Sequence, residues 1–273
     1  MKNVKNDIIR LIASDIDGTL LRSDGTVSDY TVQVIHKAQE QGILFTVCSG
    51  RFPEHAHTLL KNYGIFCPVC GNNGVTLWDA ATDTFLMDHL ISRDAIGSIW
   101  QAAEKLRLSY IVFGRKFVIA SDAEANRIAR GRFTERLMED YGVHYYLGKT
   151  AVQDALDRPI NKFYFYNLSY AERAALNAIP GVTVTSSGFG NAEIIPLGCS
   201  KANGVEEMAK LHGFTLDQTM AIGDYDNDVP MLTAAGLGVA MGNAADAVKA
   251  RVRYVTDTND QDGMAKAVEK YVL

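Results

Sequence analysis

Two aspartates separated by one residue follow an apolar run near the start of the chain. Asp15 and Asp17 come after residues 8–14 and are followed by Gly18 and Thr19. Few polar residues interrupt the run, which predicts a strand buried on both faces, as in parallel sheets. Because ligands of open α/β sheets bind beyond the carboxyl ends of strands, both carboxylates would border a crevice. Crowded carboxylates repel each other unless a cation or a shared proton relieves them, and Mg²⁺ suits hard oxygen ligands that also hold phosphate.

The same residues could also form nothing more than a turn. Asp and Gly are common turn residues, and a strand followed by Asp-Gly often only reverses the chain. The site interpretation is therefore preferred only if other segments supply further groups for the same crevice.

Four further segments place polar groups where we expect a strand to end or a helix to begin. They are Ser49-Gly50-Arg51, Asn72-Asn73-Gly74, Ser200-Lys201 and Asp224-x-x-Asn227-Asp228. Taken singly, Lys201 could be a solvated lysine and Ser49 a helix cap or turn former. So many polar loops in chain order, all at strand or helix ends, are hard to explain as turns. The segments together indicate one site.

These groups have the chemistry of phosphoryl transfer. A carboxylate can attack phosphorus to form an aspartyl-phosphate, which divides one difficult displacement into two easier ones. Mg²⁺ held by a few carboxylates would orient the phosphoryl group and reduce the repulsion between two anions. Ser49 and Gly50 could donate to phosphate oxygens, and Lys201 would add positive charge. Asp17 could protonate the leaving alcohol and then activate the hydrolytic water.

The pattern of elements changes twice along the chain. Strand, helix, strand, helix and strand alternate up to about residue 71, and the alternation resumes near Lys201. Hairpins and helices fill the interval, and residues 161–168 alternate like one strand of a half-exposed sheet. We therefore expect an α/β fold with a doubly wound parallel sheet, formed by residues 1–82 and 193–273. Residues 83–192 would be an inserted, smaller α+β cap domain.

Composition argues against several other classes of protein. The 273 residues, 47% hydrophobic and 22% charged, suit one large or two moderate domains. A net charge of −5 disfavours a broad nucleic-acid surface. No apolar run is long enough for a membrane span, and no leader peptide is recognisable, so we expect a cytoplasmic protein. Cys67-x-x-Cys70 lacks a second pair for zinc and a following helix, so these cysteines should be packing residues.

The motifs together resemble the haloacid dehalogenase superfamily, specifically its Cof-type (class IIB) phosphatases. In chain order they are Asp15-Ile16-Asp17-Gly18-Thr19-Leu20, Cys48-Ser49-Gly50-Arg51, Asn73-Gly74, Ser200-Lys201-x-x-Gly204 and Gly223-Asp224-x-x-Asn227-Asp228-x-x-Met231. The first and last are the most specific, and the set frames nearly the whole chain. Ser49 stands where members often carry Thr, and Ala202 where they often carry Gly, but neither change removes a reactive group.

The resemblance implies a role for each group. Asp15 would be the nucleophile, Asp17 the general acid and base, and Ser49 and Lys201 catalytic phosphate ligands. The implied phosphate- or substrate-binding set is Ser49, Gly50, Arg51, Asn73, Lys201 and Asn227. The implied Mg²⁺ set is Asp15, Asp17 through its carbonyl, Asp224 and Asp228, with Asn227 in support.

Two choices remain open at this point, and they concern Arg51 and the paired asparagines. Arg51 could reach the substrate or form a structural ion pair. Either Asn72 or Asn73 could face the crevice.

We therefore expect a Mg²⁺-dependent hydrolase of small phosphate monoesters such as sugar phosphates. Its partner would be a phosphorylated metabolite and neither nucleic acid nor a membrane. A phosphomutase or phosphotransferase, in which a sugar hydroxyl replaces water, is the main alternative. A phospho-aspartate signalling module is disfavoured because it needs neither the inserted unit nor Asp17. Specificity should lie on the inserted unit, which by resemblance is a mobile cap. The candidate contacts there are Arg115, Lys116, Tyr145, Tyr146 and Lys162, although ordinary surface is the preferred interpretation for most of them.

Overall fold

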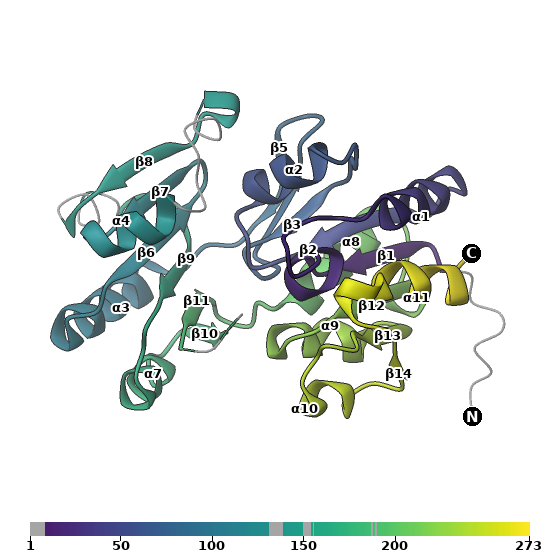
Figure 1. Cartoon of the computed structure of the whole chain (residues 1–273). Coiled ribbons are helices and arrows are strands. Elements are labelled where there is room, and N and C mark those ends of the chain that lie inside the picture. The colour runs from purple at the N-terminus through teal and green to yellow at the C-terminus, as the bar shows by residue number, and fades with distance from the viewer. Residues whose placement is uncertain (1–8, 131–138, 150–153, 155, 187, 189) are drawn as a thin grey trace. The chain divides into compact units, whose positions relative to one another are not determined.

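The computed structural model describes residues 9–130, 139–149, 154, 156–186, 188 and 190–273. These residues form two compact units, each with its own sheet (Figure 1). The first unit comprises the described part of Met1–Leu86 together with Ser200–Leu273, and the second is Met87–Cys199. The second unit is therefore inserted between two halves of the first.

An eight-stranded sheet forms the centre of the first unit, in the order β14-β13-β12-β1-β2-β3-β4-β5. All neighbouring pairs from β14 to β3 are parallel, and β4 pairs antiparallel with β3. The strand order runs outward in both directions from β1, as in a doubly wound sheet. The strands are β1 (Leu11–Ser14), β2 (Leu44–Cys48), β3 (Val69–Gly71), β4 (Thr76–Asp79), β5 (Thr84–Asp88), β12 (Thr219–Gly223), β13 (Leu237–Ala240) and β14 (Tyr254–Val255).

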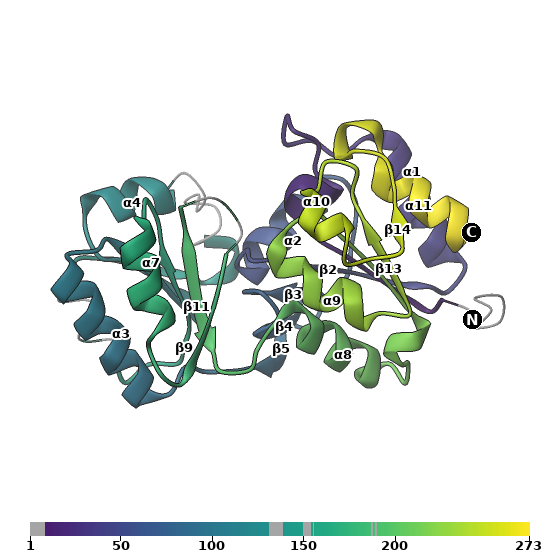
Figure 2. The same ribbon diagram turned by 90° about the horizontal axis from the view of Figure 1, so that it is seen from below.

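Helices pack on both faces of the parallel part of this sheet. They are α1 (Asp29–Glu40), α2 (Pro53–Lys61), α8 (Lys201–Leu211), α9 (Val229–Ala234), α10 (Asp246–Lys249) and α11 (Gly263–Tyr271). Ile12, Phe45 and Val47 are fully buried or nearly so in one core cluster with residues of α1, α2 and α11. Because side chains alternate along a strand, Cys48 points to the other face, which α8 and α9 cover side by side (Figure 2).

The second unit contains a six-stranded sheet in the order β10-β11-β9-β6-β7-β8. Its neighbours are antiparallel except β7 and β8, which are parallel. Tyr110, Phe163 and Phe165 form its main core with residues of α3 and α7. The elements are α3 (Arg93–Leu106), β6 (Tyr110–Gly114), β7 (Phe117–Ala120), α4 (Ala123–Arg130), β8 (His144–Leu147), β9 (Ile160–Phe165), α7 (Tyr170–Asn177), β10 (Val182–Thr185) and β11 (Ala192–Pro196).

The fold class is confirmed, but both expected domain boundaries need correction. β5 continues the eight-stranded sheet past residue 83, so the first unit extends to Leu86. β11 pairs with β9 and β10, so residues 193–199 belong to the second unit. Strand pairing determines to which sheet β5 and β11 belong, and a change of sequence pattern does not reveal that pairing. Within the described residues, no helix is long and apolar enough to cross a membrane.

The expectation of a half-exposed strand at residues 161–168 is also wrong. The strand in this region is β9 (Ile160–Phe165), and all six of its residues are buried. Phe163 and Phe165 belong to the core beneath α3 and α7. Lys162 and Tyr164 alternate with them and are 3% and 7% exposed. Polar residues at alternate positions predicted solvent, whereas here Lys162 is buried with a charged partner.

Gly204 allows α8 to pack directly against β3 and the turn that follows β3. A Cβ atom at this position would lie 2.3 Å from Cys70 Sγ and 2.8 Å from Gly74 Cα. The close approach fixes the first turn of α8, which carries Lys201. A larger residue at position 204 would displace this turn.

We expect Gly204→Ala to lower the free energy of unfolding by about 1–3 kcal/mol, because the added methyl overpacks a filled interface. Gly97→Ala is the matched control, since Gly97 lies within α3 and a Cβ there meets nothing within 4 Å. That change should stabilise by about 1 kcal/mol or less, through helix propensity and reduced unfolded-state entropy. Chemical denaturation of both variants measures the difference, and equal effects would contradict the packing argument.

Candidate active site

The turn after β1 holds Asp15 and connects it to the loop after β12. The Asp15 amide donates to Ile222 O at 2.9 Å, which continues the pairing of β1 with β12. Gly18 has φ +79°, and a Cβ there would lie 2.4 Å from Asp224 Oδ2. Thr19 Oγ1 donates to Asp224 Oδ1 at 3.0 Å. Only glycine fits at position 18, so the Asp-Gly-Thr sequence determines where the Asp224 carboxylate lies.

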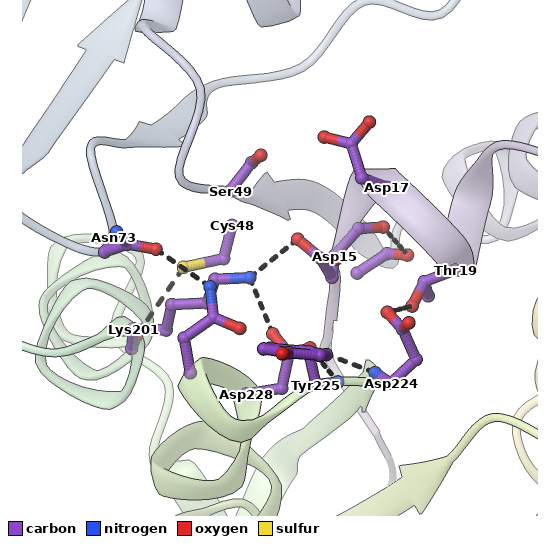
Figure 3. Close-up of polar contacts among 12 residues, drawn as sticks. Asp15, Asp17, Thr19, Cys48, Ser49, Asn73, Lys201, Asp224, Tyr225 and Asp228 are labelled. Carbon is purple, nitrogen blue, oxygen red and sulfur yellow. Dashed lines mark hydrogen bonds and ion pairs between the residues drawn. The ribbon is translucent and has the colours of Figure 1, made fainter. Parts of the chain in front are cut away.

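Lys201 links the two acidic loops. Its Nζ donates to Asp15 Oδ1 and to Asp228 Oδ1, each at 2.6 Å, and its side chain is 1% exposed (Figure 3). Burial lowers the pKa of Lys201, but Asp15 and Asp228 raise it, and the net shift is upward. Burial raises the pKa of Asp15 well above its ordinary value, while Lys201 opposes that shift. The first turn of α8 thus holds a protonated ammonium group between two carboxylates.

Asp228 is fully buried, and protein donors occupy both of its oxygens. Oδ1 accepts from Lys201, and Oδ2 accepts from the amides of Asp224 and Tyr225 at 3.0 Å each. Asp228 therefore shapes the loop that presents Asp224. Asp228 was expected to be a metal ligand, but both of its oxygens already accept hydrogen bonds from the protein.

Three carboxylates cluster where sequence reasoning placed a metal. One oxygen each of Asp15, Asp224 and Asp228 lie within 4.8 Å of one another. Burial raises the pKa of Asp224 to about 6, and the Asp228 carboxylate adds to that shift. A hard divalent cation would relieve this crowding, so the donor set fits such an ion. Asp15 and Asp224 fit it better than Asp228, whose oxygens already have donors.

Asp17 lies outside this carboxylate cluster and pairs with Arg51. Arg51 Nε donates to Asp17 Oδ2 at 2.8 Å and Nη2 donates to Oδ1 at 2.6 Å. The Asp17 carboxylate points away from Asp15 and Lys201 (Figure 3). Of the two interpretations of Arg51, the structure therefore contains the ion pair. A metal contact through the Asp17 carbonyl, which the resemblance implies, stays a prediction.

The loops after β2 and β3 are joined by backbone hydrogen bonds. The amides of Asn72 and Asn73 donate to Arg51 O and Ser49 O, each at 2.9 Å. Ser49 Oγ accepts from the Arg51 amide at 3.2 Å, and Gly50 lies between these two residues. The asparagine side chain that turns toward the other predicted residues belongs to Asn73, whose Oδ1 accepts from Asn227 Nδ2 at 3.1 Å. The phosphate-binding roles of Ser49, Gly50, Asn73 and Asn227 stay predictions.

The candidate contacts on the second unit have partners of their own. Lys162 forms a buried ion pair with Glu193 at 2.9 Å, so it is not a surface residue. Arg115 donates to Asp88 at 2.7 Å, and Tyr145 donates to Asn126 at 2.9 Å. Tyr146 lies under the guanidinium of Arg158, and Lys116 adopts a left-handed backbone conformation in the turn between β6 and β7.

Sequence reasoning assigned no role to two residues that support the site. Thr19 orients Asp224, as described above, and its place in the Asp-Gly-Thr motif was the available signal. Asn243 Nδ2 donates to Gly18 O at 2.8 Å, while its Oδ1 accepts from the Asn259 amide at 3.0 Å. Asn243 follows an apolar strand just as Asp15 does, so the same strand-end rule would have found it.

The fold and the site define an α/β protein with an acidic, lysine-containing centre at the carboxyl ends of parallel strands. Residues 12–268 match the model of the haloacid dehalogenase-like hydrolase family. The chain belongs to this family and is an enzyme of the hydrolase class, as its motifs predicted.

Individual relatives agree over nearly the full length. The chain is 30% identical over 265 residues to a Bacillus subtilis protein named 5-amino-6-(5-phospho-D-ribitylamino)uracil phosphatase YcsE, covering 97% of this chain and 96% of that one. A solved haloacid dehalogenase-like hydrolase from B. subtilis has a TM-score of 0.83 at 26% identity, covering 97% and 100%. A subclass IIB sugar phosphatase shares the fold, with a TM-score of 0.81 at 23% identity, covering 96% and 98%.

We expect Asp228→Ala to lower the free energy of unfolding by about 3 kcal/mol, the low end of the range for breaking a buried ion pair, because Asp15 still pairs with Lys201. The matched control is Asp226→Ala, two residues away and exposed, which should change stability by no more than about 0.5 kcal/mol. Thermal or chemical unfolding measures both. A small effect at Asp228 would mean that Lys201 does not depend on it.

Proposed function

We propose that the protein is a Mg²⁺-dependent phosphatase of small phosphate monoesters that forms an aspartyl-phosphate on Asp15. The observation that carries the proposal is the contact of the buried Asp15 carboxylate with Lys201, 2.6 Å away, inside the carboxylate cluster. A carboxylate in such a setting has a cation beside it to attract a phosphate dianion. The named phosphatase among the relatives supports the same activity.

Each residue of the site would act on a different atom of the ester. Asp15 would attack phosphorus while the bond from phosphorus to the ester oxygen breaks, and Asp17 would give that oxygen a proton. Asp17 would then take a proton from the water that attacks the aspartyl-phosphate, which returns Asp15 and releases inorganic phosphate. Lys201, Ser49 and the Gly50 amide would hold phosphate oxygens through both steps.

The metal would be held by Asp15 and Asp224, with Asp228 fixing the loop behind them. When bound, a divalent cation supplies positive charge that draws the phosphate dianion toward an anionic nucleophile. Thr19 would keep Asp224 turned toward that position, since its hydroxyl donates to Asp224 Oδ1.

The substrate class we propose is a phosphorylated metabolite of modest size, such as a sugar phosphate or a sugar alcohol phosphate. The proteins that support this class are the B. subtilis relative, named for a phosphoribitylamino compound, and the structural neighbour described as a sugar phosphatase. The second unit would provide the contacts that select among such esters.

We expect Asp15→Asn to reduce phosphate release by roughly 10³-fold or more, because an amide cannot serve as the nucleophile. Asp29→Asn, an exposed acid at the start of α1, is the control and should leave the rate unchanged. When turnover of an ester labelled in its phosphoryl group is quenched with acid, the wild-type protein should retain label and Asp15→Asn should retain none. Near-wild-type turnover by Asp15→Asn would refute covalent catalysis at Asp15.

Removal of divalent metal by EDTA should lower phosphate release by roughly 10²-fold or more, and added Mg²⁺ should restore it, since the metal contributes several kcal/mol to such reactions. The assay contains no acceptor alcohol, so phosphate release also separates a hydrolase from a phosphomutase. Mg²⁺ should raise the melting temperature of the wild type and not that of Asp224→Asn. Undiminished rates after chelation would remove the metal from the proposal.

A further inference from the structure

We propose that Arg51 is a positioning residue for Asp17 and not a ligand of the substrate phosphate. The inference rests on the proposed function, in which Asp17 transfers protons. It excludes the substrate contact that sequence reasoning had left open for Arg51.

The contact between the two side chains is a fork. Nε and Nη2 of Arg51 each reach a different oxygen of Asp17, at 2.8 and 2.6 Å. Paired donors of this kind fix the plane of a carboxylate as well as its distance. The Asp17 side chain is 58% exposed and that of Arg51 is 22% exposed, so Arg51 is the more firmly embedded of the two.

Arg51 itself is held by the loops around it. Its amide donates to Ser49 Oγ, its carbonyl accepts from the Asn72 amide, and its Nη1 lies 3.4 Å from His55 Nε2. Burial lowers the pKa of Arg51, while the hydrogen bonds and charge of Asp17 raise it, with a net upward shift. The guanidinium is therefore a charged, anchored group beside a carboxylate that is itself largely exposed.

This arrangement keeps Asp17 out of the carboxylate cluster. Asp17 is only two residues from Asp15, close enough to raise the pKa of both Asp15 and Asp224 by its charge. Without Arg51, its carboxylate could rotate toward Lys201 or toward a metal bound by Asp15 and Asp224. A fourth carboxylate beside Asp15, Asp224 and Asp228 would compete with the phosphate for Lys201 and the metal.

Arg51 can stay bound while Asp17 transfers a proton. Oδ1 of Asp17 would keep its bond from Nη2, while Oδ2 would exchange its bond from Nε for the proton that it gives to the ester oxygen and later takes from the attacking water. The retained bond acts as a pivot that leaves the reacting oxygen little freedom. Since displacements of about 1 Å can cost 10²-fold in rate, a defined pivot has a large effect.

The test compares two esters that differ in their need for a proton. An aryl ester such as p-nitrophenyl phosphate expels a stable phenolate, whereas an alkyl ester such as glycerol 2-phosphate must have its leaving oxygen protonated. kcat/KM reports the step that releases the alcohol. Arg51→Ala should lower kcat/KM for the alkyl ester by roughly 10²-fold, the low end of what general acid catalysis supplies. For the aryl ester, Arg51→Ala should lower kcat/KM by less than about 10-fold.

Three variants make the result decisive. Arg51→Lys keeps the charge and one donor, so it should recover part of the alkyl-ester rate. In an Asp17→Asn background, Arg51→Ala should cause no further change in the ratio of the two rates. Arg22→Ala is the matched control, because Arg22 forms the same kind of fork with Asp262 in another part of the first unit. It should reduce stability and leave the ratio unchanged.

Failure of this inference and failure of the proposed function give different results. Equal losses on both esters, persisting in Asp17→Asn, would identify Arg51 as a phosphate ligand and overturn the inference. If the protein with only the Asp17→Asn substitution hydrolysed the alkyl ester at the wild-type rate, that result would instead overturn the role of Asp17 in the proposed function.

Discussion

The site depends on one buried cation, the ammonium group of Lys201. An uncompensated charge at 1% exposure would cost several kcal/mol, so Lys201 can occupy this place only with Asp15 and Asp228 beside it. Asp15 follows β1, Asp228 follows β12 and Lys201 begins α8. Two ion pairs therefore hold together three segments that are far apart in the chain. The insertion of the second unit before α8 does not disturb this centre, because the contact closes within the first unit.

Sequence reasoning predicted the composition of the site through a single rule. Polar residues that follow apolar parallel strands meet at one sheet edge, which is why Asp15, Ser49, Asn73 and Asp224 come from the ends of β1, β2, β3 and β12. The rule gives no side-chain direction. It could not show that Asp228 turns both oxygens to protein donors, or that Arg51 bonds to Asp17. Those outcomes depend on the register and height of neighbouring loops, which only the folded chain defines.

The second unit was less predictable for a related reason. Alternation of residue types in β9 indicated one exposed face, but β11 brings Glu193 beside Lys162, and a paired charge can be buried. The unit boundaries were wrong by a few residues because hydrogen bonding to a neighbouring strand, and not composition, decides to which sheet β5 and β11 belong. In each case the missing information is a partner that lies far away in sequence.

One short turn places the carboxylates of Asp15 and Asp17 in different surroundings. Asp15 is buried and pairs with a lysine, whose ammonium group has several donors and can hydrogen-bond to two anions at once. Asp17 is largely exposed and meets an arginine, whose planar fork fixes one carboxylate in a defined plane. If the two were exchanged, a lysine would leave Asp17 free to rotate, and an arginine would bring a larger, planar group to the buried position between Asp15 and Asp228. The choice of cation thus separates the group proposed to attack phosphorus from the group proposed to move the proton.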